Sequence, residues 1–203
     1  MSTPTKIEAV IWDLGGVIVR TEDMEPRNTL AKRLDLSREE IERLVFEADE
    51  GFSAQLGEID GEDHMRAVSH KLGLSLGELR LQFFGGDRVD QELVSFIRAL
   101  RPGRKTALLS NALSNLRAFL TDQWKISDAF DLIVVSAEEG ILKPDPAIYQ
   151  LTLSRLGVIA ADAVFIDDVA INVEAAVDVG MQGILFKSRE QALGELRPLL
   201  VGE

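Results

Sequence analysis

The amino-acid sequence predicts an α/β protein with a doubly wound parallel sheet as its Rossmann-like core and a small helical cap domain inserted near its start. Short apolar runs of strand length recur along the chain, and from Val89 onward they alternate with helix-length patterns. Such alternation is typical of a parallel sheet that is covered by helices. A long segment between the first and second runs carries helix signals only, which indicates a separate helical unit.

The first predicted strand covers residues 7–12 and is followed by one carboxylate, Asp13, and then by Gly15 and Gly16. A short apolar run bounded by glycine is typical of a buried strand in a parallel sheet. Such a strand brings Asp13 to its carboxyl end, where open α/β sheets bind their ligands. Asp13 is then either a nucleophile or a residue that caps the turn.

Four further apolar runs are predicted to be strands of the same sheet. They lie at residues 105–109, 132–135, 163–166 and 183–186. Gly180 stands between the last two runs, at the position where a glycine commonly ends a helix.

The segment from Arg20 to Asp87 departs from this alternation, because it contains helix starts and no convincing strand. Ser37 and Ser75 are each followed three residues later by a glutamate, which is the pattern of a capping box. Asp60 is placed to cap a third helix.

We therefore predict a core domain made of residues 1–17 and 89–203 and a helical cap domain made of residues 18–88. An ordinary helical packing layer is the weaker interpretation, because a single crossover between strands needs far fewer residues. The inserted segment follows Asp13 directly, so the cap is placed to cover that site as a lid.

Composition excludes several classes of function. The formal net charge is −12, which argues against nucleic acid or an anionic membrane as a partner. The chain has no cysteine, so disulfides, thiolate metal sites and a cysteine nucleophile are excluded. Residues 1–6 are polar, and we find neither a signal region nor a segment apolar enough to span a bilayer. We expect a cytoplasmic protein that is a monomer or a homodimer.

Polar residues follow the later strands as well. Ser110 and Asn111 come directly after the second run, where a hydroxyl, an amide and a starting helix can bind an anionic oxygen, although both residue types also serve as helix caps. Lys143 is followed by two prolines that stiffen its loop. A fixed ammonium suits a phosphate and a neighbouring carboxylate, and the alternative is a plain junction between a loop and a helix.

Asp167 and Asp168 end the fourth run, and Asn172 stands four residues after Asp168. Two adjacent carboxylates repel each other unless a divalent cation lies between them and Asp13. If a helix begins just after Asp168, Asn172 lies one turn on and can orient an acid. A charged turn without function is the less favoured interpretation directly after a buried run.

These four motifs, in this order, resemble those of the haloacid dehalogenase-like hydrolase superfamily. The first motif, Asp-Leu-Gly-Gly-Val, looks most like that of bacterial members that include sugar-1-phosphatases, and the amino-terminal domain of epoxide hydrolase is a more distant relative. The resemblance covers essentially the whole chain, and the helical insert is similar to the C1-type cap of that family.

The resemblance implies a magnesium-dependent phosphatase that acts on a small phosphorylated metabolite. Asp13 would attack phosphorus to form an aspartyl-phosphate, with Lys143 as a second catalytic residue. The implied Mg²⁺ ligands are Asp13, the carbonyl of Gly15, Asp168, and Asp167 directly or through water. The groups implied to hold the phosphoryl oxygens are Ser110, the Asn111 amide and Lys143.

Gly15 departs from the family pattern, because most phosphatases of this superfamily carry a general acid at this position. General acid catalysis is worth about a hundredfold to ten-thousandfold in rate. Either the leaving group needs little protonation, as with a sugar 1-phosphate or an acyl phosphate, or another group supplies the proton, or the protein is a weak catalyst.

Two other functions are compatible with this pattern. A 2-haloacid dehalogenase also lacks the second acid, but it generally lacks the acidic pair that Asp167 and Asp168 form here. A catalytically weak member would act as a binding module for a metabolite or a protein.

Several polar residues of the cap are candidates for substrate contact by their chemistry alone: Arg20, Arg27, Asp49, Gln55 and His64. Of these, His64 is predicted to be a surface or packing residue rather than a catalyst.

Overall fold

A five-stranded parallel sheet forms the centre of the protein in the computed structural model, which describes residues 6–201. Its strands, in the spatial order β5-β4-β1-β6-β7, are Leu132–Val135, Lys105–Ser110, Ala9–Trp12, Ala163–Asp167 and Gln182–Leu185. Every neighbouring pair is parallel. The predicted parallel sheet is confirmed, and each of the five predicted runs forms one of its strands.

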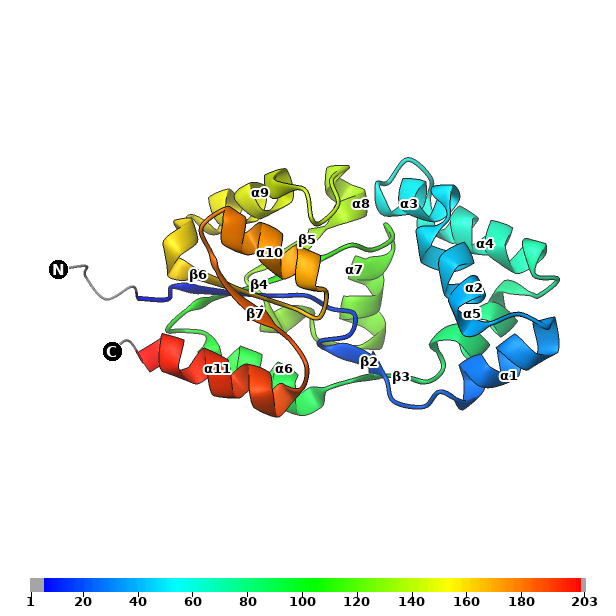
Figure 1. The fold of residues 1–203 in the computed structure, drawn as a ribbon, viewed down its shortest axis with the longest axis horizontal. Coiled ribbons are helices and arrows are strands. Elements are labelled where there is room, and N and C mark those ends of the chain that lie inside the picture. Colours follow the sequence, from blue (N-terminus) through cyan, green and yellow to red (C-terminus); the bar gives the residue numbers. More distant parts are fainter. Residues whose placement is uncertain (1–5, 202–203) are drawn as a thin grey trace.

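Helices of the second part of the chain cover both faces of the sheet. They are α6 (Gln91–Leu100), α7 (Leu116–Ala118), α8 (Ser136–Glu139), α9 (Pro146–Leu156), α10 (Ala170–Asp178) and α11 (Arg189–Val201). Short turns of other helix types lie at Phe119–Gln123, Ser127–Ala129 and Ala160–Asp162. Helices α9 and α10 lie on one face and α6 and α11 on the other (Figure 1).

The central strand explains why the predicted runs are continuously apolar. Val10 and Trp12 of β1 belong to the apolar layer that contains α6 and α11. Ala9 and Ile11 alternate with them and belong to the layer that contains α9 and α10. Because both faces are buried, a strand in this position has no polar side.

Five helices form a separate group beside the carboxyl edge of the sheet (Figure 1). They are α1 (Glu25–Leu34), α2 (Arg38–Glu42), α3 (Asp49–Gln55), α4 (Gly61–Lys71) and α5 (Leu76–Phe84), with a π-helical turn at Arg43–Glu47. The capping boxes at Ser37 and Ser75 are both present, and Asp60 caps α4. These helices share an apolar cluster of their own, which includes Leu79 and Phe83.

Two short strands were not predicted. Strand β2 (Val19–Thr21) pairs in an antiparallel manner with β3 (Asp87–Val89), and Thr21 lies opposite Asp87. The prediction that the segment from Arg20 to Asp87 holds no strand is therefore wrong at both ends. Each strand has three residues, so neither carries the alternation that reveals a longer strand.

The division into a core (1–17 and 89–203) and a cap (18–88) stays a prediction, and residues 1–5 and 202–203 of that core lie outside the described residues. Between residues 6 and 201, no helix combines the length and the apolar character that crossing a membrane requires.

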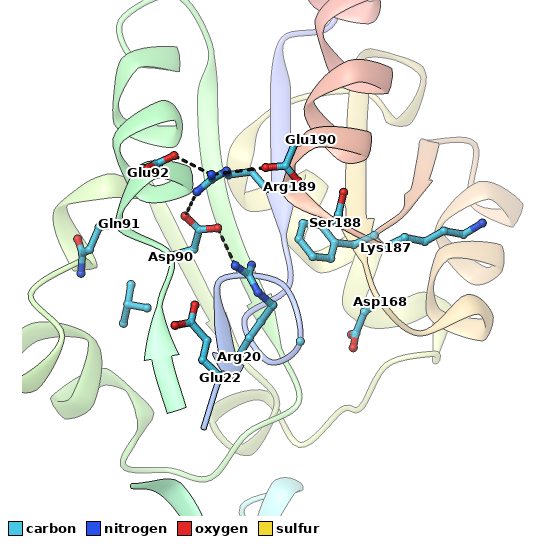
Figure 2. Close-up of a pocket in the computed structure, with 13 residues that line it drawn as sticks. Arg20, Glu22, Asp90, Gln91, Glu92, Asp168, Lys187, Ser188, Arg189 and Glu190 are labelled. Atoms are coloured by element: carbon cyan, nitrogen blue, oxygen red, sulfur yellow. Dashed lines mark hydrogen bonds and ion pairs between the residues drawn. The ribbon is translucent and has the colours of Figure 1, made fainter. Parts of the chain in front are cut away.

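Asp90 joins the base of the β2–β3 ribbon to the helices α6 and α11 of the core. Its carboxylate accepts from the Leu93 amide at 2.9 Å and so caps α6, and it forms ion pairs at 2.8 Å with Arg20 of β2 and Arg189 of α11 (Figure 2). Burial alone would raise the pKa of Asp90, but the hydrogen bonds from Arg20, Leu93 and Arg189 outweigh it and lower the pKa. Arg20, a candidate for substrate contact, thus forms a structural ion pair with Asp90.

Replacing Asp90 by Asn should lower the free energy of unfolding by about 2 kcal/mol, because the hydrogen bond from Arg20 is lost and Arg189 loses the negative charge of its partner, while the oxygen that caps α6 and accepts from Arg189 remains. Urea titration followed by circular dichroism would measure the change. Asp145→Asn is the matched control, since Asp145 caps α9 through the Ala147 amide and forms no ion pair among the described residues. Equal effects of both substitutions would contradict the role of the arginines.

Candidate active site

Asp13 lies at the carboxyl end of β1, the central strand. Its amide donates to the Ile166 carbonyl at 2.8 Å, which extends the pairing of β1 with β6 by one residue, and Asp13 is buried. The turn that follows needs a glycine at Gly16, where φ is +73° and a Cβ atom would lie 1.9 Å from a carboxylate oxygen of Asp168. Gly16 therefore lets Asp168 approach the loop that carries Asp13.

Lys143 joins two of the predicted acids. Its buried Nζ donates to Asp13 at 2.7 Å and to Asp167 at 2.6 Å. Asn111 holds the lysine loop in place, because its side chain donates to the Lys143 carbonyl at 2.9 Å and accepts from the Lys143 amide at 2.8 Å. The side chain of Asn111 thus uses its hydrogen bonds to position the loop that carries Lys143. The sequence did not reveal this role.

Asp167 and Asp168 have different surroundings. Asp167 is fully buried, and both of its carboxylate oxygens accept from the protein: one from the Val169 amide at 2.8 Å, the other from Lys143 and, at 3.1 Å, from the Asn172 side chain. Asp168 is exposed. Asn172 orients an acid as predicted, and that acid is Asp167.

One carboxylate oxygen from each of Asp13, Asp167 and Asp168 lies within 4.8 Å of the others. Hard oxygen donors at this spacing suit a divalent cation such as Mg²⁺. Lys143 supplies one positive charge against three carboxylates, so a cation here would relieve the remaining repulsion. The donor set therefore fits the metal that the sequence resemblance implies.

Burial and neighbouring charges shift the pKa values of the cluster. Burial raises the pKa of Asp13 to about 6 against the lowering effect of Lys143, and the charge of Asp167 adds to the rise. Desolvation and the charge of Asp167 raise the pKa of Asp168. Burial alone would lower the pKa of Lys143, but the charges of Asp13 and Asp167 outweigh it and raise the pKa. Lys143 is therefore held as an ammonium.

Asp13 lines a cavity of about 970 Å³ whose other walls come from both the sheet edge and the helices α4 and α5. Its lining includes Asp13, Gly15, Ser110 and Asn111. Ser110 is buried at the end of β4 and lies at the same edge as Asp13, as the sequence predicts.

Most of the polar candidates of the inserted helices are engaged elsewhere. Arg27 pairs with Glu42 and Asp87. Gln55 is buried and donates to the Phe46 carbonyl at 2.6 Å. Asp49 begins α3.

His64 is buried in the same helical group, where its Nε2 lies 2.8 Å from the Val45 carbonyl. It is therefore a packing residue, one of the two alternatives predicted for it.

Residues 7–180 match the haloacid dehalogenase-like hydrolases, and the chain belongs to this family of hydrolases. The resemblance inferred from the four motifs is thus confirmed. Sesquiterpene phosphatase astK of Aspergillus oryzae is 28% identical over 200 residues, which cover 97% of this chain and 98% of that protein. A stretch of 111 residues is 40% identical to mouse (Mus musculus) acyl-CoA dehydrogenase family member 10, and it covers 54% of this chain but 10% of that longer protein.

A solved structure shows the same fold. It is a haloacid dehalogenase family enzyme of Bacteroides thetaiotaomicron in complex with magnesium and inorganic phosphate, and it superposes with a TM-score of 0.75 at 20% identity. The superposition covers 90% of this chain and 96% of that chain.

Proposed function

We propose that this chain is a magnesium-dependent phosphatase that hydrolyses a phosphate monoester through an aspartyl-phosphate on Asp13. The observation that carries the proposal is the arrangement of Asp13, Asp167 and Asp168, whose carboxylate oxygens lie within 4.8 Å of one another beside a buried lysine. The relative named as a phosphatase, which matches nearly the full length of the chain, supports the same reaction.

Asp13 is the nucleophile in this proposal. Its carboxylate oxygen forms a bond to phosphorus while the bond from phosphorus to the alcohol oxygen breaks, and water later cleaves the aspartyl-phosphate to release inorganic phosphate. Lys143 holds one oxygen of Asp13 and offers its charge to the phosphoryl group. Ser110 and Asn111 line the same cavity as Asp13, and the Ser110 hydroxyl and the Asn111 backbone amide can bind the other phosphoryl oxygens.

The groups that would hold Mg²⁺ are Asp13, Asp168 and the carbonyl of Gly15. Asp167 suits an outer position, because protein donors already occupy both of its oxygens. When bound, the ion neutralises the repulsion between the anionic nucleophile and the anionic substrate.

A panel of phosphate monoesters, assayed for released phosphate with Mg²⁺ and after chelation, tests the proposal. We expect turnover that requires Mg²⁺ and vanishes in Asp13→Asn. Absence of turnover across aryl, acyl and sugar phosphates would contradict the proposal, and so would turnover that is indifferent to chelation.

Asp167 and Asp168 should differ in how much each contributes to Mg²⁺ affinity. We expect Asp168→Asn to weaken Mg²⁺ binding by roughly a hundredfold or more, and Asp167→Asn by about tenfold, because removing an outer partner costs less than removing a direct ligand. Isothermal titration calorimetry with MgCl₂ measures both variants, which lose the same formal charge and so control for each other. A larger loss in Asp167→Asn would reverse the assignment.

A further inference from the structure

The cavity above Asp13 has aromatic and aliphatic side chains on both of its walls. Three such residues from the inserted helices are Phe46, Leu81 and Phe84, and three from the core are Leu113, Phe119 and Trp124. The rings of Phe46 and Phe84 lie edge to face with centroids 6.3 Å apart, and those of Phe119 and Trp124 are 5.8 Å apart. An apolar partner between these walls would remove their surface from water.

Most of the charged groups of the cavity are already paired within the protein. Of its four arginines, Arg20 pairs with Asp90, Arg27 with Glu42 and Asp87, and Arg80 with Glu62. The fourth, Arg88, donates to the carbonyls of Gly85 and Asp87. The walls therefore offer few free charges to a charged or hydroxyl-rich leaving group.

Two amides, Asn115 and Gln123, are further polar residues of the core wall. They are too few to satisfy the hydroxyl groups of a hexose, and each hydroxyl that is buried without a partner opposes binding. The apolar walls thus disfavour the sugar phosphates that the sequence resemblance suggests.

Gly15 adds a second constraint on the alcohol. It carries no acid, and no heavy atom lies within 4 Å of the position that its Cβ would occupy. An alcohol that leaves without a proton from this position must itself be acidic, and phenolic hydroxyls are far more acidic than those of ordinary alcohols.

We infer that the preferred substrate is the phosphate monoester of an extended aromatic alcohol. Its phosphate is bound at Asp13 and its rings lie between the aromatic walls. The volume of about 970 Å³ is large enough for several fused rings. This inference rests on the proposed phosphatase function, because it names the substrate class of the same site.

Hydrolysis of 2-naphthyl phosphate, phenyl phosphate and glucose 1-phosphate tests the inference, because naphthol and phenol have similar acidity and differ in apolar surface. We expect kcat/KM for naphthyl phosphate to exceed that for phenyl phosphate at least tenfold, mainly through KM. Naphthyl phosphate should exceed glucose 1-phosphate by a still larger factor.

Leu81→Ser and Trp124→Ala should reduce the ratio of naphthyl to phenyl activity by at least threefold. Leu81 is 71% exposed, so its substitution should leave folding intact. Ile159→Ser is the matched control, because Ile159 is 66% exposed and lies outside the lining of this cavity.

The outcomes separate the two proposals. If none of the three esters is hydrolysed, the phosphatase function itself fails. If they are hydrolysed and naphthyl phosphate shows no advantage, or if its advantage survives both cavity substitutions, the inference about the alcohol is overturned while the phosphatase proposal stands.

Discussion

Substitution of Asp13 by Asn is expected to abolish phosphate release, with a loss of roughly ten-thousandfold or more, while the protein stays folded. An amide has no anionic oxygen with which to form an acyl-phosphate. Asn retains the shape of Asp and an oxygen that accepts from Lys143, whose Nζ lies 2.7 Å from the carboxylate. The loss therefore isolates the chemical role of the carboxylate from its structural role.

Steady-state phosphate release measures this loss, and circular dichroism checks the fold. Asp145→Asn, a cap substitution at the start of α9, is the control and should retain wild-type turnover. Mass spectrometry of wild-type enzyme quenched in acid should find phosphate on Asp13. Turnover near the wild-type rate in Asp13→Asn would exclude covalent catalysis through this residue, and an unfolded variant would show that Asp13 is structural.

Gly15→Asp is expected to raise activity on alkyl phosphates by about a hundredfold or more, because it supplies the general acid that the first motif lacks. The structure leaves space for the side chain, since a Cβ atom at Gly15 would meet no heavy atom within 4 Å. The left-handed φ of the turn belongs to Gly16, so an aspartate at Gly15 does not meet that conformational barrier.

Rates across phosphates of graded leaving-group acidity test this expectation. The wild type should depend steeply on acidity, and sugar 1-phosphates should outrun their 6-phosphate isomers. Gly15→Asp should flatten that dependence, with little gain on aryl phosphates. Gly16→Ala is the contrasting variant and should be inactive, because its Cβ would lie 1.9 Å from Asp168. A flat dependence in the wild type, with chemistry rate-limiting, would show that another group donates the proton.

The edge of the sheet that carries the candidate active site could be predicted from the sequence because the sheet is parallel. Buried parallel strands appear as continuous apolar runs, and their carboxyl ends meet at one edge. Strand β1 lies between β4 and β6, which brings Asp13 between the residues that follow those two strands. The meeting of Asp13 with Asp167 follows from this order alone.

Other features of the site depend on contacts that leave no periodic signal. The bonds between the Asn111 side chain and the Lys143 backbone join two loops that lie 32 residues apart in the chain. The division of roles between Asp167 and Asp168 depends on which carboxylate the Val169 amide and Asn172 reach. The apolar cavity arises where two groups of elements face each other, and each group alone shows only an ordinary amphipathic pattern.

The β2–β3 ribbon has a consequence for protein engineering. The chain leaves the sheet region through Thr21 and returns through Asp87, and these two residues lie opposite each other in the ribbon. A tight turn placed after Thr21 and before Asp87 would therefore close the chain without moving either end. A different helical unit could then be joined to the same two strands. Such an exchange would replace the helical wall of the cavity, while Asp13, Lys143 and the other residues of the proposed active site remain in place.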